Sequence, residues 1–198
     1  MPRTRLVIAS RNPGKLREID AILAPLDFEV IAQDALGVSE AEEPYPTFLE
    51  NALTKARHAS AATGLPALAD DSGICVAALA GAPGVYSARY AGEPRSDQRN
   101  NARLIEALAG AADRRAHYYC IIVVVRSADD PQPLIGEGIW RGEVAHEPSG
   151  AGGFGYDPWF LIPSIGQTAA QMPTELKNRV SHRALALADI AGRLRAGF

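Results

Sequence analysis

The sequence predicts an α/β protein, an elongated mixed sheet with flanking helices and a central cleft. Strand, loop and helix follow one another at the start of the chain, which is typical of parallel strand units. In the middle, residues 118–125 are rich in β-branched and aromatic side chains, and residues 134–144 are their expected partner across a turn. Parallel units followed by a hairpin indicate a mixed sheet.

Apolar periodicity and turn residues place the individual elements. Thr47 and Glu50 form a capping box, which predicts the start of a helix with its apolar face at Phe48, Leu49, Leu53 and Ala56. The elements predicted for the first half of the chain are a strand at 5–9, a turn at 10–15, a helix at 15–23, a strand at 28–32, a helix after 47 up to 64, and strands at 67–71 and 74–79. Those predicted for the second half are a helix at 97–108, strands at 118–125 and 134–144, a glycine-rich loop at 150–157, a strand at 159–162 and a helix at 182–194.

Composition limits the class of protein. With 198 residues, of which 47% are hydrophobic and 22% charged, the chain is expected to form a single domain over residues 1–198. The net charge of −3 disfavours a nucleic-acid polymer as partner. Cys75 and Cys120 are too few for a disulfide framework, and no apolar run suits a signal peptide or a membrane span. We therefore expect a cytoplasmic protein that does not bind membranes.

Two adjacent carboxylates, Asp70 and Asp71, stand before Ser72 and Gly73 at the end of an apolar run. Successive side chains of a strand point to opposite faces, so one aspartate is expected to line a site and the other to support it. A hard divalent cation is the natural partner of such oxygens. Taken alone, the same four residues also suit an ordinary solvated turn.

The segment from Ser10 to Lys15 joins a predicted strand to a predicted helix. It ends in Gly-Lys but lacks the first glycine of a P-loop, and Leu16 stands where that motif has Ser or Thr. A helix start still offers free N–H groups to a phosphate, and Asn12 and Lys15 can add a donor and a charge. An ordinary strand–helix turn is an equally good reading of these residues alone.

Three weaker groups follow along the chain. Glu42 and Glu43 precede the helix that starts after Thr47, where acidic residues are often simply solvated. The loop around residues 152–157 combines glycines with two aromatic side chains that could stack on a flat ring. Lys177 and the run at 181–183 supply donors that could read a ring carbonyl, although such residues at a helix start are commonly solvated.

Together these motifs resemble the inosine triphosphate pyrophosphatase family of the bacterial dITP/XTP type. The resemblance covers nearly the whole chain. The segments that carry it are residues 6–15, 48–55, 69–73, 81–90, 153–158 and 181–183. It implies a two-lobed α/β fold around a long central cleft. It also implies a homodimeric enzyme that hydrolyses ITP, dITP and XTP to the monophosphate and pyrophosphate with Mg²⁺, clearing deaminated purines from the nucleotide pool.

The resemblance also implies roles for individual residues. Asp71 is expected at the metal and as proton acceptor, with Glu42 or Glu43 completing the metal site and Glu43 favoured. The residues expected to bind the triphosphate are Ser10, Arg11, Asn12, Pro13, Gly14, Lys15 and, less firmly, Lys55. Ser72 is expected to contact the nucleotide. The residues expected to form the base pocket are Phe154, Gly155, Tyr156, Asp157, Lys177, His182 and Arg183.

Two departures from related bacterial sequences concern the base pocket. Leu176 and Ala184 stand where a polar residue and a glycine are often found, which leaves the fine base selectivity open. Three further interpretations compete with this enzyme: a non-catalytic purine nucleotide sensor, an RNA-binding module, and a pyrophosphatase for canonical or modified pyrimidine nucleotides. The retained acidic residues disfavour the sensor, and the acidic pI of about 5.8 disfavours the RNA-binding module. The base pocket alone would decide against the pyrimidine enzyme.

Overall fold

The computed structural model describes residues 3–26 and 28–196, so the ends of the predicted domain at 1–198 lie outside the described residues. The elements of the first half are β1 (Thr4–Ile8), α1 (Pro13–Leu23), β2 (Phe28–Ala32), the 3₁₀ helix η1 (Gln33–Leu36), α2 (Phe48–Thr63), β3 (Ala67–Val76), η2 (Ala77–Leu79) and η3 (Gly84–Arg89). Those of the second half are α3 (Asp97–Ala107), β4 (Arg115–Val125), β5 (Leu134–Val144), η4 (Asp157–Trp159), β6 (Phe160–Ile162), β7 (Gln167–Thr168), α4 (Thr174–Val180) and α5 (His182–Arg195).

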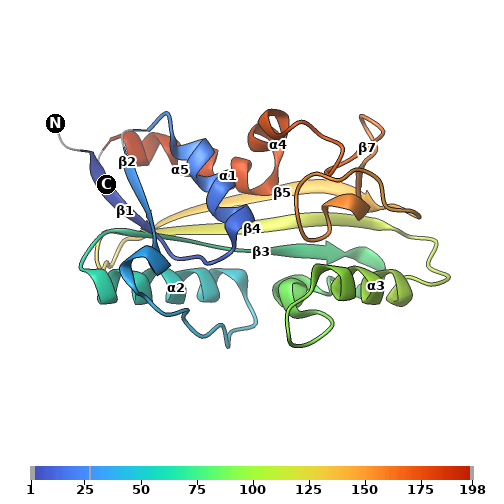
Figure 1. The fold of residues 1–198 in the computed structure, drawn as a ribbon, viewed down its shortest axis with the longest axis horizontal. Helices are drawn as coiled ribbons and strands as arrows, with labels where there is room; N and C mark the ends of the chain where they lie inside the picture. Colours follow the sequence, from blue (N-terminus) through green and yellow to red (C-terminus); the bar gives the residue numbers. More distant parts are fainter. Residues whose placement is uncertain (1–2, 27, 197–198) are drawn as a thin grey trace. The chain divides into compact units, whose positions relative to one another are not determined.

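The strands form one seven-stranded sheet in the order β2-β1-β3-β4-β5-β6-β7 (Figure 1). The strand β1 pairs in parallel with β2 and β3, whereas β5 with β6 and β6 with β7 pair antiparallel. The predicted mixed α/β class is therefore confirmed. Its parallel part comes from the strand–helix units at the start of the chain, as the sequence indicated.

The chain divides into two compact units. The first unit comprises residues 1–71, 120–138 and 183–198, and the second comprises residues 72–119 and 139–182. The strands β3, β4 and β5 each run from one unit into the other. The single domain with a central cleft stays a prediction.

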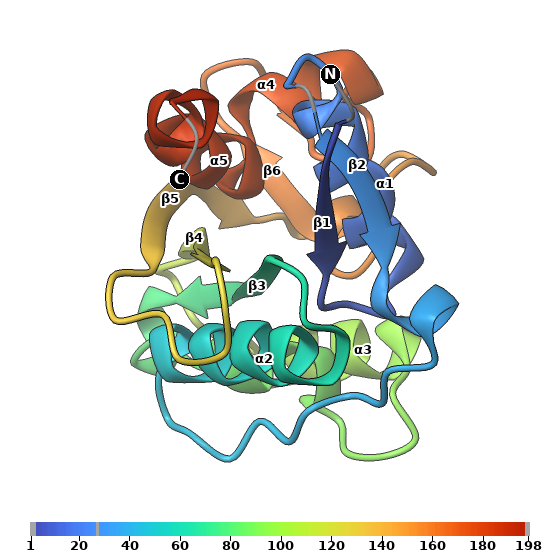
Figure 2. The same cartoon turned by 90° about the vertical axis from the view of Figure 1, so that its left-hand side faces the viewer.

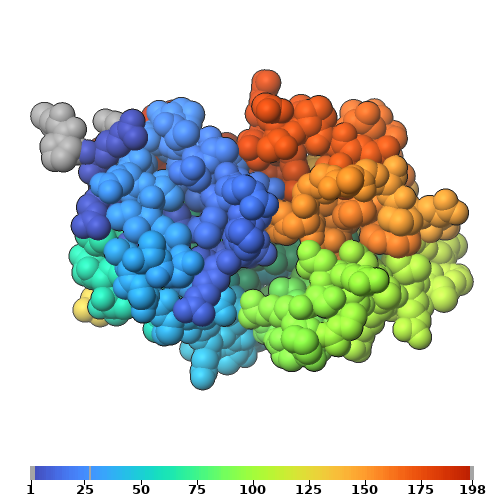
Figure 3. Space-filling view, viewed as in Figure 1, coloured from blue at the N-terminus to red at the C-terminus, as the bar shows by residue number. Residues whose placement is uncertain are grey.

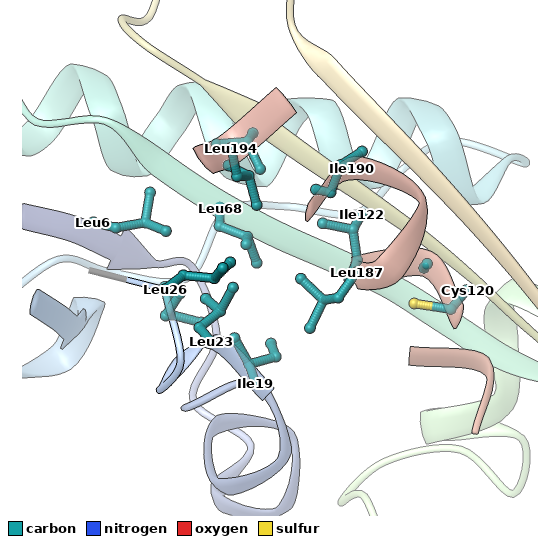
Figure 4. Packing of buried hydrophobic residues seen from close by; sticks show 13 residues of the cluster. Leu6, Ile19, Leu23, Leu26, Leu68, Cys120, Ile122, Leu187, Ile190 and Leu194 are labelled. Atoms are coloured by element: carbon teal, nitrogen blue, oxygen red, sulfur yellow. The ribbon is translucent and has the colours of Figure 1, made fainter. Parts of the chain in front are cut away.

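In the first unit, helices cover both faces of the strands. Figure 1 shows α2 on one side of β3 and α1 with α5 on the other, and Figure 2 agrees. The side toward α1 and α5 is an aliphatic core, in which Leu68 of β3 packs with Ile19 and Leu187 of the two helices (Figure 4). The side toward α2 is built from small residues, because Ala52 and Ala56 of that helix are fully buried.

The burial of α2 corrects one sequence prediction. Thr47 does cap the helix, since its hydroxyl accepts a hydrogen bond from the N–H of Glu50, and the helix ends before Gly64 as expected. The predicted apolar face is only partly right, because Leu49 is 40% exposed. Small and polar residues line the buried face instead, since a helix pressed closely against a sheet leaves little room for larger side chains.

In the second unit, α3 and α4 lie on opposite sides of the strands (Figure 1). The core is rich in aromatic rings, with Tyr118, Trp140 and Phe160 packed together. Leu104 and Leu108 anchor α3 and the residue after it to this core. The helix is thereby fixed to the strands that it covers.

The strand β3 differs most from its prediction. Two strands separated by a turn at Asp70 to Gly73 were expected, but Ala67–Val76 is one continuous strand. Gly73 allows this, because a Cβ atom at that position would lie 2.2 Å from the carbonyl oxygen of Gly84 and 2.4 Å from Ser87 Oγ. The glycine therefore serves a close backbone approach rather than a turn.

Other boundaries shift by smaller amounts. The helix α1 begins at Pro13, a residue that suits a first helical position, and β4 begins at Arg115 rather than at 118. The predicted strand at 159–162 is a 3₁₀ turn followed by a three-residue strand. The helix α4 was not predicted, because seven residues carry too little periodicity. Within residues 3–26 and 28–196, no helix has the length and apolar character needed to span a membrane.

Candidate active site

The loop from Ser10 to Lys15 connects β1 to α1 in the first unit, whose surface includes this blue N-terminal segment in Figure 3. Asn12 caps the helix, because its Oδ1 accepts hydrogen bonds from the N–H groups of Gly14 at 2.8 Å and Lys15 at 3.1 Å. Arg11, Asn12 and Pro13 are exposed, and Ser10 and Lys15 are half-buried. The loop thus presents polar groups and a helix start at the surface.

Asp70 points to the side of β3 that packs against α1 and α5. Its Oδ2 lies 3.0 Å from Lys15 Nζ and 2.9 Å from Arg183 Nη2. Arg183 also donates to Glu18 of α1. The side chains of Arg183, Asp70 and Glu18 are all buried. Burial alone would raise the pKa of Asp70, but Lys15 and Arg183 hold it well below its usual range.

Asp71 points to the opposite side, toward α2. Lys55 Nζ lies 3.0 Å from Asp71 Oδ1 and 2.6 Å from Glu43 Oε1, so one ammonium group bridges two carboxylates. The buried Asn51 donates to Asp71 Oδ2 at 3.4 Å and to the carbonyl of Tyr45 at 3.0 Å. The alternation expected of neighbouring strand residues is therefore confirmed for the two aspartates.

The electrostatics of this second cluster differ from those around Asp70. Burial raises the pKa of Asp71, and the attraction of Lys55 does not cancel that effect. Burial alone would lower the pKa of Lys55, but Asp71 and Glu43 raise it to about 12. Lys55 is thus charged at neutral pH and lies between two acidic side chains.

Asp71 and Glu43 offer carboxylate oxygens of the kind that bind hard divalent cations. No group of three or more His, Cys, Asp or Glu side chains that could hold a metal occurs among residues 3–26 and 28–196. Mg²⁺ commonly takes one or two protein carboxylates together with substrate phosphates and water, so a full protein cage is not required. Asp71 and Glu43 already hold a cationic group, Lys55 Nζ, between them. Glu42 is exposed.

In the second unit, Asp157 is a buried hub for the glycine-rich loop. Its Oδ2 accepts hydrogen bonds from Lys177 Nζ at 2.5 Å and from the N–H of Phe154 at 2.9 Å. The hydroxyl of Tyr118 lies 3.4 Å from Oδ1 of the same carboxylate. Lys177 Nζ also lies 4.9 Å from the centre of the Phe154 ring. The carboxylate thus fixes both the lysine and the aromatic residue.

Aromatic packing decides which rings are accessible. The imidazole of His182 stacks on Tyr118 with ring centres 4.5 Å apart, and it is 5% exposed. Tyr156 is buried in the core of the unit, where its hydroxyl donates to the carbonyl of Ser87 at 2.8 Å. Phe154 is half-buried. Of the two loop aromatics predicted to stack on a ring, Phe154 is the better placed.

The structure thus groups the predicted residues within each unit. The first unit brings together Lys15, Asp70 and Arg183, and separately Glu43, Lys55 and Asp71. The second unit brings together Phe154, Asp157 and Lys177, with His182 stacked on Tyr118. Gly155 belongs to the same loop, and Ser72 follows Asp71 in β3 as a half-buried residue.

The sequence predictions missed Glu18, Asn51 and Tyr118. Glu18 lies three residues after Lys15 and Asn51 lies four residues before Lys55, so each shares a helix face with a predicted residue. That spacing was a usable signal. No comparable spacing connects Tyr118 with Asp157, because their contact depends on how distant segments fold together.

Comparisons with known proteins show which family the chain belongs to. The family model described as the Ham1 family matches residues 6–192. The chain belongs to the Ham1 family. A dITP/XTP pyrophosphatase of Nitrosomonas europaea is 65% identical over 190 residues, covering 96% of this chain and 94% of that protein. A dITP/XTP pyrophosphatase of Ralstonia nicotianae is 64% identical over 194 residues, covering 96% of each chain.

A solved Ham1 structure is similar along almost the whole chain. The HAM1 protein of Coxiella burnetii superposes with a TM-score of 0.90 at 46% identity, covering 98% of this chain and all of that one. The family resemblance inferred from the motifs is therefore confirmed. Because Ham1 proteins share the fold at this level of identity, the elements that carry both clusters belong to the family architecture.

Proposed function

We propose that this Ham1 chain hydrolyses dITP, XTP and ITP to the nucleoside monophosphate and pyrophosphate, and so removes deaminated purines from the nucleotide pool. The observation that carries the proposal is the pair of carboxylates, Asp71 and Glu43, that share the ammonium group of Lys55. The names of the relatives support the substrate class. Cleavage of the α–β anhydride releases pyrophosphate as one piece.

Asp71, Glu43 and Lys55 would carry out the phosphate chemistry. Bound Mg²⁺, held by Asp71 and Glu43, would neutralise the triphosphate and polarise the reacting phosphorus. Asp71 would orient the attacking water and accept its proton, a role suited to a carboxylate whose pKa is raised by burial. Lys55 would contribute a fixed positive charge, which its pKa of about 12 maintains at neutral pH.

The loop from Ser10 to Lys15 would bind the triphosphate. Its exposed Arg11 and its helix start attract anions, and Asn12 and Lys15 add polar and charged groups. Lys15 is held by Asp70, so its ammonium is positioned rather than mobile. Glu42 is exposed and has no comparable contact with Lys55, so we assign the metal role to Glu43.

Phe154, Lys177 and His182 would form the base pocket, with backbone N–H groups of the glycine-rich loop as donors. Inosine and xanthine carry a carbonyl at position six, whereas adenine carries an amino group that would leave such donors unpaired. Arg183 was expected among these donors, but its guanidinium lies against Asp70 and Glu18. We therefore propose that Arg183 holds Asp70, a role that its removal tests below.

The decisive experiment is a product assay on ITP, dITP, XTP, ATP and GTP, with and without magnesium. Pyrophosphate released only from the deaminated purines, and only with the metal, would support the proposal. Orthophosphate as the product would refute the assigned bond. Binding without turnover would favour a nucleotide sensor instead of an enzyme.

We also propose that the protein is a homodimer in the cytoplasm. Cys75 and Cys120 are both free thiols, which suits a reducing compartment. The dimer follows from the family resemblance alone. Light scattering behind size-exclusion chromatography would test it, because a mass near the 21.0 kDa of one chain would refute it.

A further inference from the structure

The glycine-rich loop of the second unit is held by hydrogen bonds from within the loop and from α3. Gly150, Gly153 and Gly155 adopt positive φ angles of 84°, 71° and 62°, a conformation that costs backbone entropy to hold. Asp157 fixes Phe154 from within the loop. Gly155 follows Phe154 directly and has no side chain, so only its backbone can be held in place.

Both backbone polar groups of Gly155 are bound by one helix. The N–H of Gly155 donates to Asp97 Oδ2 at 2.7 Å, and its carbonyl accepts from Asn101 Nδ2 at 3.0 Å. Asp97 and Asn101 are four residues apart, which places them on one face of α3. Two side chains on one helix therefore clamp a single glycine residue of a loop more than 50 residues away in sequence.

The helix that provides the clamp is itself well anchored. The hydroxyl of Ser96 accepts from the N–H of Arg99 and caps the start of α3. At the other end Leu104 and Leu108 are buried in the aromatic core. The hydrogen bond to Asp97 is charge-assisted and short, which makes it the stronger half of the clamp.

We propose that Asp97 and Asn101 are positioning residues that hold Phe154 in place for the purine base. The inference rests on the proposed function, because it assigns to Phe154 the contact with the base. Asp97 and Asn101 belong to the second unit, whereas the carboxylates that would carry out the chemistry belong to the first. Loss of the clamp is therefore expected to weaken nucleotide binding and to leave the chemical step largely intact.

Steady-state kinetics with ITP would test the clamp. Asp97→Ala should raise KM about tenfold and Asn101→Ala about fivefold, with kcat within about twofold, because each loses one hydrogen bond to the loop. Asp97→Asn keeps an acceptor oxygen and should stay within about twofold of the original KM. Gln98→Ala, an exposed neighbour on α3, is the matched control and should leave both constants unchanged.

A double-substitution cycle distinguishes positioning from general stability. If the clamp acts through Phe154, Asp97→Ala should add little to the KM of Phe154→Ala, because both remove the same contact. Additive effects would overturn the inference, as would an unchanged KM in both alanine variants. Should Asp97→Ala fail to fold, Asn101→Ala supports the same cycle.

The clamp and the proposed function fail in different ways. If the unsubstituted protein releases no pyrophosphate from ITP, dITP or XTP, the proposed function is refuted. The clamp is then judged by the Kd for ITP, followed through the fluorescence of Trp140 and Trp159 in the same unit. A rise in this Kd in the alanine variants, of the size expected for KM, would support the clamp, and an unchanged Kd would overturn it.

Discussion

On the side of β3 that faces α1 and α5, Asp70 and Glu18 pair with Lys15 and Arg183, whereas on the side that faces α2, Asp71 and Glu43 both pair with Lys55. The ion pairs on the first side join two basic side chains to two acidic ones, and those on the second side join one basic side chain to two acidic ones. Adjacent residues of one strand thus occupy a balanced ion cluster and an acidic one. The imbalance, rather than the carboxylates themselves, marks the side suited to a divalent cation.

The largest difference between the two sides should appear in catalysis. We expect Asp71→Asn to lower kcat for ITP by about 10³-fold, the range typical of losing a general base. Stability should be retained, because burial already disfavours the charged form of Asp71. Pyrophosphate release and thermal melting would be measured together, with the exposed Asp20→Asn on α1 as the control. Near-normal turnover would refute the role of Asp71.

The balanced side should matter most for stability. Arg183→Ala leaves Asp70 and Glu18 without their shared cation, which should lower the free energy of unfolding by about 3–5 kcal/mol. Urea denaturation would measure this loss. Arg115, an exposed partner of Asp113, provides an Arg→Ala control that should not move the midpoint. A stable Arg183→Ala protein with altered discrimination between ITP and ATP would instead place Arg183 at the base.

The pKa values of the two aspartates should also be shifted in opposite directions. In the metal-free protein, ¹³C NMR of the carboxyl groups should show Asp71 titrating above the ordinary value of about 3.9 and Asp70 below it. Asp70 therefore contributes stability that is complete above its unfolded pKa and lost as the pH falls through its folded pKa. Asp71 contributes stability that is complete below its unfolded pKa and lost as the pH rises through its folded pKa, because its protonation favours the folded state.

Adding magnesium to the same NMR titration would test the two clusters a second time. The ion should lower the apparent pKa of Asp71 and leave that of Asp70 unchanged, because only Asp71 lies in the acidic cluster. Equal shifts at both residues would contradict the separation of the two sides. Indistinguishable titrations in the metal-free protein would do the same.

The smallest effect should come from the start of α2. Thr47→Ala removes the cap that precedes Asn51 and Lys55 and should cost about 1 kcal/mol of stability. Because tertiary packing still holds the helix, kcat should change by less than about twofold. Thr47→Ser keeps the hydroxyl and should therefore keep the free energy of unfolding of the unsubstituted protein, as measured by urea denaturation. A tenfold fall in kcat would mean that the cap positions the acidic cluster directly.

The sequence was sufficient for the class of fold and for most elements. The capping box at Thr47, the apolar run along β1 and the turn that precedes β5 are local signals, and the structure has these elements close to the predicted bounds. The continuity of β3 was not predictable in this way. Glycine is common in turns, and only the nearby backbone of Gly84 explains why Gly73 stands in a strand.

The candidate site shows the same limit. Alternation along a strand was enough to predict that Asp70 and Asp71 divide their tasks, and the structure confirms that they face opposite helices. Which aspartate meets which cation depends on packing between distant segments. The pairing of Arg183 with Asp70 joins residues 113 positions apart, and nothing local in either motif specifies it.

The close approach at Gly73 has a consequence for strand register. If β3 slipped by one residue, Asp70 and Asp71 would exchange faces. One cluster would then receive the wrong aspartate, and the other would receive Ala69 or Ser72 in place of its carboxylate. Such a slip would also bring the Cβ of Ser72 or Ile74 toward the carbonyl of Gly84, where a Cβ does not fit. Gly73, the one residue of this motif without a side chain, therefore fixes the strand register that places Asp70 and Asp71 on their respective faces.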